Sequence, residues 1–100
     1  MKERTKLLIR HGGEEFVVIL FNTSKEELLH YAEMLRRAVY DRKFEAPTKE
    51  VAEYVTISIG SAIEHLPKEE LRYEKMLLRV DKALYEAKNL GKNCVVYAKE

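Results

Sequence analysis

Apolar residues near the start of the chain fall into two short runs, residues 7–9 and 16–21, which flank a polar segment. Runs of this length that are rich in Val, Ile, Leu and Phe are typical of β-strands. The polar segment holds two glycines followed by two carboxylates: Gly12, Gly13, Glu14 and Glu15. Glycine reaches the positive φ angles of tight turns, so the pattern predicts a β-hairpin. Carboxylates at its tip suit either an ordinary polar turn or a site for a hard cation such as Mg²⁺.

Residues 24–41 change to a helical spacing. Ser24 and Glu27 fit a capping box, in which side chains satisfy backbone amides at the start of a helix. Apolar residues then recur every three or four positions: Leu28, Tyr31, Leu35 and Val39. Charged residues occupy the other faces, so one stripe should pack inward. We expect this helix to end between residues 41 and 45, because Pro47 disfavours helical geometry in the residue before it.

The next segment alternates between apolar and polar residues, which predicts a strand over residues 51–63. Val55, Ile57 and Ile59 would share one face of this strand. Gly60 would allow a bend or a bulge near its end.

A second helix is expected over residues 73–89, where an apolar stripe returns at helical spacing. Gly91 follows as a natural left-handed residue just past the helix end, and residues 93–97 read as a last strand. The element order β-β-α-β-α-β predicts a single α/β domain over residues 1–100, a sandwich with helices packed on a sheet.

Composition narrows the classes of ligand. The 18 basic and 17 acidic residues give a formal charge of +1, which provides no general attraction for nucleic acid or an anionic membrane, so we expect neither as a partner. A phosphate ligand would therefore need a local cluster of basic residues. Cys94 is the single cysteine, which excludes an internal disulfide, and we expect a buried, inert thiol. The first residues are too polar for a signal peptide or membrane span, which favours the cytoplasm.

Three segments in order carry a resemblance to a known family. Gly-Gly-Glu-Glu-Phe at residues 12–16 is followed by Thr-Ile-Ser-Ile-Gly at 56–60 and by Val-Asp-Lys-Ala-Leu-Tyr-Glu-Ala-Lys-Asn-Leu-Gly-Lys-Asn at 80–93. Together they resemble the GGDEF domain of bacterial diguanylate cyclases, over residues 7–97. The resemblance implies a nucleotide-cyclase-like palm fold with a mainly antiparallel sheet. It also implies synthesis of cyclic di-GMP from two GTP molecules, with Mg²⁺ or Mn²⁺ as cofactor.

The resemblance assigns roles to seven residues. Glu14 would be the metal-binding and catalytic carboxylate, and Glu15 the second acidic, catalytic position. The remaining positions would bind the nucleotide: Arg10, Gly12, Gly13, Lys88 and Lys92. The two lysines are four residues apart, which places them on one face of a continuing helix. They could instead complement the helix C-terminus, and Asp81 and Tyr85 could serve in capping or packing rather than in the site.

Several features of the family pattern have no counterpart in these 100 residues. Only nine residues precede Arg10, so we expect the chain to be the C-terminal part of the domain, without the first strand and helices that supply a second metal ligand and the guanine-reading residues. A single carboxylate binds Mg²⁺ poorly, so metal binding by the chain alone is doubtful and activity should be weak or absent. Glu3 and Lys6 stand where the product-inhibition site would be, with the opposite charges, so we expect no such inhibition.

The incomplete sheet has a further consequence. Exposed strand edges recruit other chains, so we expect a homodimer or larger oligomer formed by edge pairing or strand exchange. A non-catalytic interaction module, which pairs with a complete cyclase, is therefore the alternative to an enzyme domain. A nucleotide binder without chemistry is a third possibility.

Overall fold

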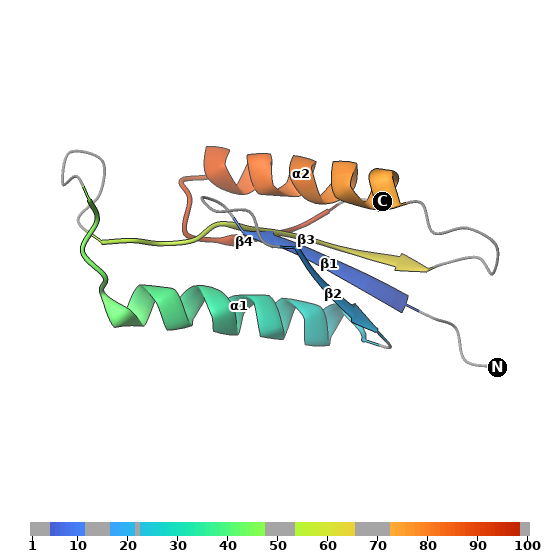
Figure 1. Ribbon diagram of the computed structural model, residues 1–100, viewed down its shortest axis with the longest axis horizontal. Coiled ribbons are helices and arrows are strands. Elements are labelled where there is room, and N and C mark those ends of the chain that lie inside the picture. Colours follow the sequence, from blue (N-terminus) through green and yellow to red (C-terminus); the bar gives the residue numbers. More distant parts are fainter. Residues whose placement is uncertain (1–4, 12–16, 22, 48–53, 66–72, 99–100) are drawn as a thin grey trace.

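The computed structural model describes residues 5–11, 17–21, 23–47, 54–65 and 73–98. Its elements follow the predicted order (Figure 1): β1 (Thr5–His11), β2 (Val17–Phe21), α1 (Lys25–Arg42), β3 (Ile59–His65), α2 (Tyr73–Asn89) and β4 (Val95–Tyr97). β1 and β2 pair in an antiparallel register, which confirms the pairing of the predicted hairpin. The turn between them, residues 12–16, lies outside the described residues.

The strands form one four-stranded sheet in the order β2-β1-β3-β4. β1 is antiparallel to both neighbours, whereas β3 and β4 are parallel, so the sheet is mainly antiparallel as expected. Among the described strands, β2 and β4 form the two edges of the sheet and β1 lies inside it. The register aligns His11 with Ile59 and Ile59 with Val95, which brings three distant segments to one end of the sheet.

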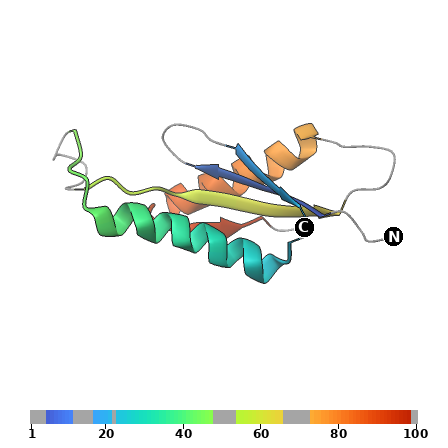
Figure 2. The same ribbon diagram turned by 60° about the horizontal axis from the view of Figure 1, so that its bottom comes forward.

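The two helices cover opposite faces of the sheet, which makes a three-layer sandwich (Figures 1 and 2). Successive residues of a strand point to opposite faces, so β3 contributes to two cores. Ile59 and Ile63 pack with Leu28 of α1, whereas Ala62 packs with Val80 of α2. Full burial of a side chain such as Leu28 or Ile59 contributes roughly 1.5–3 kcal/mol to folding. In the described part of the chain, no helix is long and apolar enough to cross a membrane.

Local signals set the helix ends as predicted. The amide of Glu27 donates to Ser24 Oγ at 3.1 Å, so Ser24 is the N-cap of α1. α2 ends in a Schellman motif: the amide of Lys92 donates to Ala87 O at 3.0 Å, and that of Gly91 donates to Lys88 O at 3.4 Å. Gly91 has a φ of 114°, which confirms the left-handed residue expected there.

The predicted strand over residues 51–63 is wrong in its bounds, because β3 covers Ile59–His65. Residues 51–53 lie outside the described residues. The ladders with β1 and β4 both begin at Ile59, so residues 55–58 have no strand beside them within the described sheet. The chain before Ile59 bonds elsewhere: the Val55 amide donates to Phe44 O at 2.7 Å. The predicted alternation still holds for Ile57, which packs against the core under α1 with Ile59.

The sequence pattern predicts that Gly60 allows a bend or bulge near the end of a strand, but it is the second residue of β3 and lies beneath α2. A Cβ placed on it would come within 2.5 Å of Leu84 N and would also clash with the carbonyl oxygen of Val80. Both atoms belong to the backbone of α2, so no side-chain rotation relieves the contact. Gly60 is therefore the residue that lets α2 approach the sheet closely.

Candidate functional site

The candidate site lies at the end of the sheet where His11, Ile59 and Val95 align, which we call the His11 end. β1 leads from here into the Gly-Gly-Glu-Glu segment, and β4 begins here directly after the loop that follows α2. α2 connects the far end of β3 back to the start of β4, so its C-terminus also lies at the His11 end (Figure 1). Topology thus brings Lys88 and Lys92 to the end of the sheet where Arg10 lies.

Arg10 reaches α2 because of its position in β1. Ile9 faces the core under α1, so the next residue points to the α2 face. Its Cα lies opposite Gly60, which has no side chain, and its guanidinium forms an ion pair with Asp81 of α2. The Arg10 side chain is 19% exposed and the Asp81 side chain 45%. The pair ties the strand before the Gly-Gly segment to the helix that carries Lys88.

The role predicted for Asp81 is thereby refined: it neither caps nor packs but forms an ion pair with Arg10. Arg10 as a nucleotide ligand stays a prediction from the resemblance. Tyr85 is 69% exposed, so the expected packing role for it is wrong. Cys94 is half-buried rather than buried, and its thiol donates to Ala87 O at 3.4 Å.

Lys88 and Lys92 both lie exposed at the His11 end, but they do not share a helical face. Lys88 is in the last turn of α2, two turns and about 10 Å along the axis beyond Asp81. Lys92 comes after the helix has ended and has a φ of 65°. A spacing of four residues implies one face only while a helix continues, and Gly91 reverses the chain between them.

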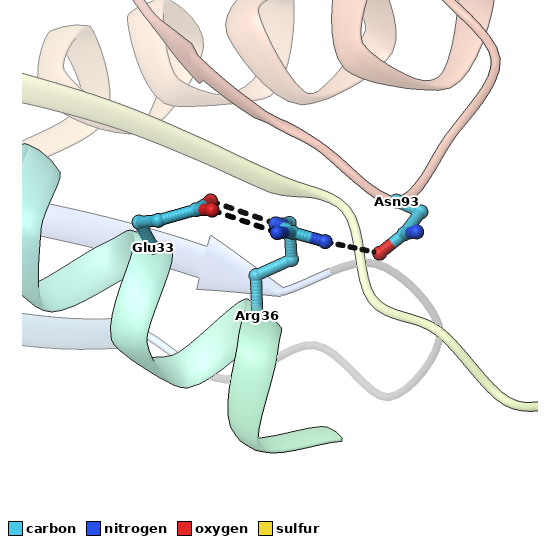
Figure 3. Close-up of polar contacts among 3 residues, drawn as sticks. All are labelled: Glu33, Arg36 and Asn93. Carbon is cyan, nitrogen blue, oxygen red and sulfur yellow. Dashed lines mark hydrogen bonds and ion pairs between the residues drawn. The ribbon is translucent and has the colours of Figure 1, made fainter. Parts of the chain in front are cut away.

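The loop that carries Lys92 is tied to α1 (Figure 3) and also to the segment before β3. Arg36 donates from Nη1 to Asn93 Oδ1 at 2.8 Å. Its Nε and Nη2 donate to the two carboxylate oxygens of Glu33, each at 2.7 Å. The hydrogen bonding between Arg36 and Glu33 lowers the pKa of Glu33 and raises that of Arg36. The amide of Asn93 donates to Ser58 Oγ at 3.2 Å. Sequence reasoning did not single out this cluster. The Glu33–Arg36 pair is a local i,i+3 contact on α1, but the bonds from Asn93 to Arg36 and Ser58 join positions far apart in the chain.

The other four predicted residues, Gly12, Gly13, Glu14 and Glu15, lie outside the described residues. The described residues hold no group of three His, Cys, Asp or Glu side chains that could bind a metal ion. The carboxylate of Asp81 is already paired with Arg10. The described part of the chain therefore does not fit a Mg²⁺ site by itself, and the assignment of Mg²⁺ to Glu14 stays a prediction from the resemblance.

Comparison with known proteins supports the family resemblance. The family model described as diguanylate cyclase, GGDEF domain, matches residues 1–94. The chain is 39% identical to diguanylate cyclase A of Treponema denticola over 90 residues, which are 90% of this chain and 23% of that protein. It is 34% identical over 91 residues to an uncharacterized membrane protein of Staphylococcus aureus (strain USA300), with coverage of 90% and 25%. The chain thus spans about a quarter of the length of these relatives.

A solved structure shows the same fold. The GGDEF domain of DgcB from Caulobacter crescentus, crystallised in complex with c-di-GMP, superposes with a TM-score of 0.73 at 18% identity. The match covers 99% of this chain and 77% of that one. Together with the family match over residues 1–94, these findings show that the chain belongs to the GGDEF domain family. The function characteristic of this family is that of a diguanylate cyclase.

Proposed function

We propose that this chain forms the part of a diguanylate cyclase domain that holds the phosphates of GTP, with the reaction being the joining of two GTP molecules into cyclic di-GMP. The observation that carries the proposal is the convergence at the His11 end. Exposed Lys88 and Lys92 lie at the same end of the sheet as His11, the last residue of the strand that precedes Gly12 and Gly13 in the sequence. A chain with a formal charge of +1 needs such a local cluster to bind a triphosphate.

The end of α2 is adapted to an anionic ligand. The C-terminus of a helix carries partial negative charge, which would repel a triphosphate. Here the carbonyls of Ala87 and Lys88 accept hydrogen bonds from Lys92 and Gly91, so they are not directed at a ligand. Two lysine ammonium groups, as mobile point charges, then supply attraction for phosphate oxygens. Complementing the helix dipole is worth only about 0.3–1 kcal/mol for each lysine, so it leaves room for a phosphate-binding role of both.

Each residue of the proposed site has a separate task. Lys88 and Lys92 bind and orient the phosphates, and Gly12 and Gly13 allow the nucleotide close to the backbone. Arg10 either contacts the nucleotide or, through Asp81, fixes the strand that carries the turn. Glu14, with Glu15 beside it, would hold a divalent cation, which supplies charge neutralisation at the phosphates when bound. Positioning of two GTP molecules accounts for most of the remaining rate.

We expect these 100 residues by themselves to bind GTP but to form product weakly or not at all. The resemblance assigns the guanine-reading residues and a second metal ligand to positions that residues 1–100 do not match. Incubation with GTP and Mn²⁺, followed by chromatography for cyclic di-GMP, measures this directly. Abundant product that disappears in Glu14→Ala would refute the expected inactivity and would establish a complete catalytic site.

Pairing with a second domain is part of the same proposal, because the reaction needs two GTP molecules presented to each other. Two exposed apolar residues on α2, Leu78 and Tyr85, lie seven positions apart and hence on one face. They favour association of the chain with another copy or with a complete cyclase, as does pairing at the edge strands β2 and β4. A well-folded monomer at micromolar concentration in light scattering would contradict association. The proposal places the domain in the cytoplasm, where GTP is available.

Titration calorimetry with GTP and Mg²⁺ tests the binding site. We expect Lys88→Ala and Lys92→Ala each to weaken binding about tenfold, equivalent to ~1.4 kcal/mol. Lys75→Ala is the matched control, because Lys75 is exposed on the first turns of the same helix, 13 residues and about 20 Å from Lys88. Equal affinity in all four proteins would overturn the assignment of the lysines.

A further inference from the structure

The cluster of Glu33, Arg36 and Asn93 links α1 to the loop after α2 across 57 positions of sequence (Figure 3). Arg36 uses Nε and Nη2 on the two oxygens of Glu33, both at 2.7 Å, which fixes the plane of its guanidinium. The third nitrogen, Nη1, is thereby aimed at Asn93 Oδ1, 2.8 Å away. The Arg36 side chain is only 15% exposed, whereas its partner Glu33 is 47% exposed.

Asn93 is held from two sides. Its side-chain oxygen accepts from Arg36, and its backbone amide donates to Ser58 Oγ at 3.2 Å. Ser58 is 5% exposed and directly precedes β3, so it belongs to a buried part of the fold. Asn93 is therefore anchored to two elements that are independent of α2.

The loop needs such anchors because of its backbone. Gly91, Lys92 and Asn93 have φ angles of 114°, 65° and 50°, three successive residues in the left-handed region. This conformation costs free energy for lysine, whereas asparagine tolerates it, so Lys92 in particular keeps it only where its surroundings impose it. On the side of α2, the Lys92 amide is fixed by Ala87 O at 3.0 Å. On the other side, Arg36 and Ser58 hold the next residue, Asn93.

We infer that Arg36, oriented by Glu33, is a positioning residue for Lys92: by holding Asn93 it sets the point from which the Lys92 ammonium reaches the phosphates of a nucleotide. The inference rests on the proposed function and deepens it, since it assigns a phosphate-positioning task to α1, which does not contact the nucleotide itself in this account. A lysine in place of Arg36 could not make the three bonds, because its single ammonium lacks the planar fork.

Two readouts of Arg36→Lys test the inference. The first is hydrogen exchange of the Asn93 amide, followed by NMR, which reports the loop without any nucleotide. We expect exchange at least ~10-fold faster in Arg36→Lys, corresponding to ~1.4 kcal/mol of lost protection, and unchanged in Arg37→Lys. Arg37 is the adjacent, exposed arginine of α1, so it is matched in charge and helix position.

The second readout is the affinity for GTP with Mg²⁺ in a double-mutant cycle with Lys92→Ala. We expect Arg36→Lys to raise Kd about threefold to tenfold when Lys92 is present and not at all in the Lys92→Ala background. Equal weakening in both backgrounds would mean a merely structural role and would overturn the inference, as would an unchanged Kd. Absence of GTP binding in the unmodified chain would instead overturn the proposed function, so the two failures are distinguishable.

Asn93→Gly provides a second variant in case Arg36→Lys fails to fold. Glycine adopts the left-handed conformation without cost, so the fold should persist while the bond to Arg36 is lost. The inference predicts the same Lys92-dependent loss of GTP affinity. Full affinity in this variant would contradict it.

Discussion

Substitution of Gly60 by alanine tests the packing that brings α2 to the sheet. The new Cβ would lie 2.5 Å from Leu84 N, whereas ordinary contact begins at 3.4 Å, so α2 or β3 must move by about 0.9 Å. The obstructing atoms are backbone, so the strain cannot be relieved by a rotamer change. The movement also separates the buried residues that α2 packs on the sheet: Met76, Val80, Ala83, Leu84 and Ala87.

The magnitude follows from this displacement. A radial gap of 0.5–1 Å loses roughly a quarter to a half of each dispersion contact, and overpacking of a core costs about 1–3 kcal/mol. Because backbone atoms are involved, we expect the upper end, ~3 kcal/mol of unfolding free energy. For a domain of 100 residues this corresponds to a fall in Tm of roughly 12–24 °C. Displacement of α2 should also weaken the Arg10–Asp81 ion pair.

Urea denaturation followed by far-UV circular dichroism measures the loss. Gly91→Ala is the control, because a Cβ at Gly91 meets no atom within 4 Å although its φ is 114°. It should cost only the backbone strain, about 1–2 kcal/mol. A loss below about 1 kcal/mol in Gly60→Ala would refute the close approach of α2, because overpacking typically costs at least that much.

Three further substitutions test contacts at the site and at the start of α1. Asp81→Asn should lower the unfolding free energy by about 1 kcal/mol, because it removes the Arg10–Asp81 ion pair, and urea titration measures this. Ser24→Ala should cost about 1 kcal/mol and fray the start of α1, visible as faster amide exchange there. Glu33→Gln should cost less than about 1 kcal/mol, because the Glu33 side chain is half exposed. Arg36 holds the pKa of Glu33 below 4.5, so this difference from the unmodified chain should be present at neutral pH and vanish as the pH falls through the lowered pKa.

Glu86→Gln is a common control for the two acidic substitutions, because Glu86 is an exposed carboxylate of α2. It should leave stability unchanged within ~0.5 kcal/mol. A Glu33→Gln difference that persisted at pH values well below the pKa of Glu33 would contradict the electrostatic origin of its contribution.

The parts of the fold that the sequence predicted are those with local causes. Ser24 begins α1 because its own hydroxyl meets an amide three residues later, and Gly91 ends α2 because its own φ is positive. The order of the elements followed from hydrophobic periodicity in the same way. Each of these signals is contained within a single helix or strand and its ends.

The errors arose where a distant segment decides the outcome. β3 begins at Ile59 because β1 and β4 begin to pair there, which the alternation of residues 51–63 cannot reveal. Gly60 is explained by Val80 and Leu84, some 20 residues later, and not by its own strand. Arg10 and Asp81 are 71 positions apart, so their ion pair gives no signal in sequence spacing.

The central claim is that Lys88 and Lys92 bind the phosphates of a guanine nucleotide. The most direct measurement compares the affinities for GTP and GMP in the unmodified chain and in the variant with both lysines replaced by alanine. We predict that the unmodified chain prefers GTP over GMP by at least ~30-fold, about 2 kcal/mol, and that the double variant loses nearly all of this preference. An unchanged ratio of the two affinities in the double variant, or no GTP binding at millimolar concentration by the unmodified chain, would contradict the account.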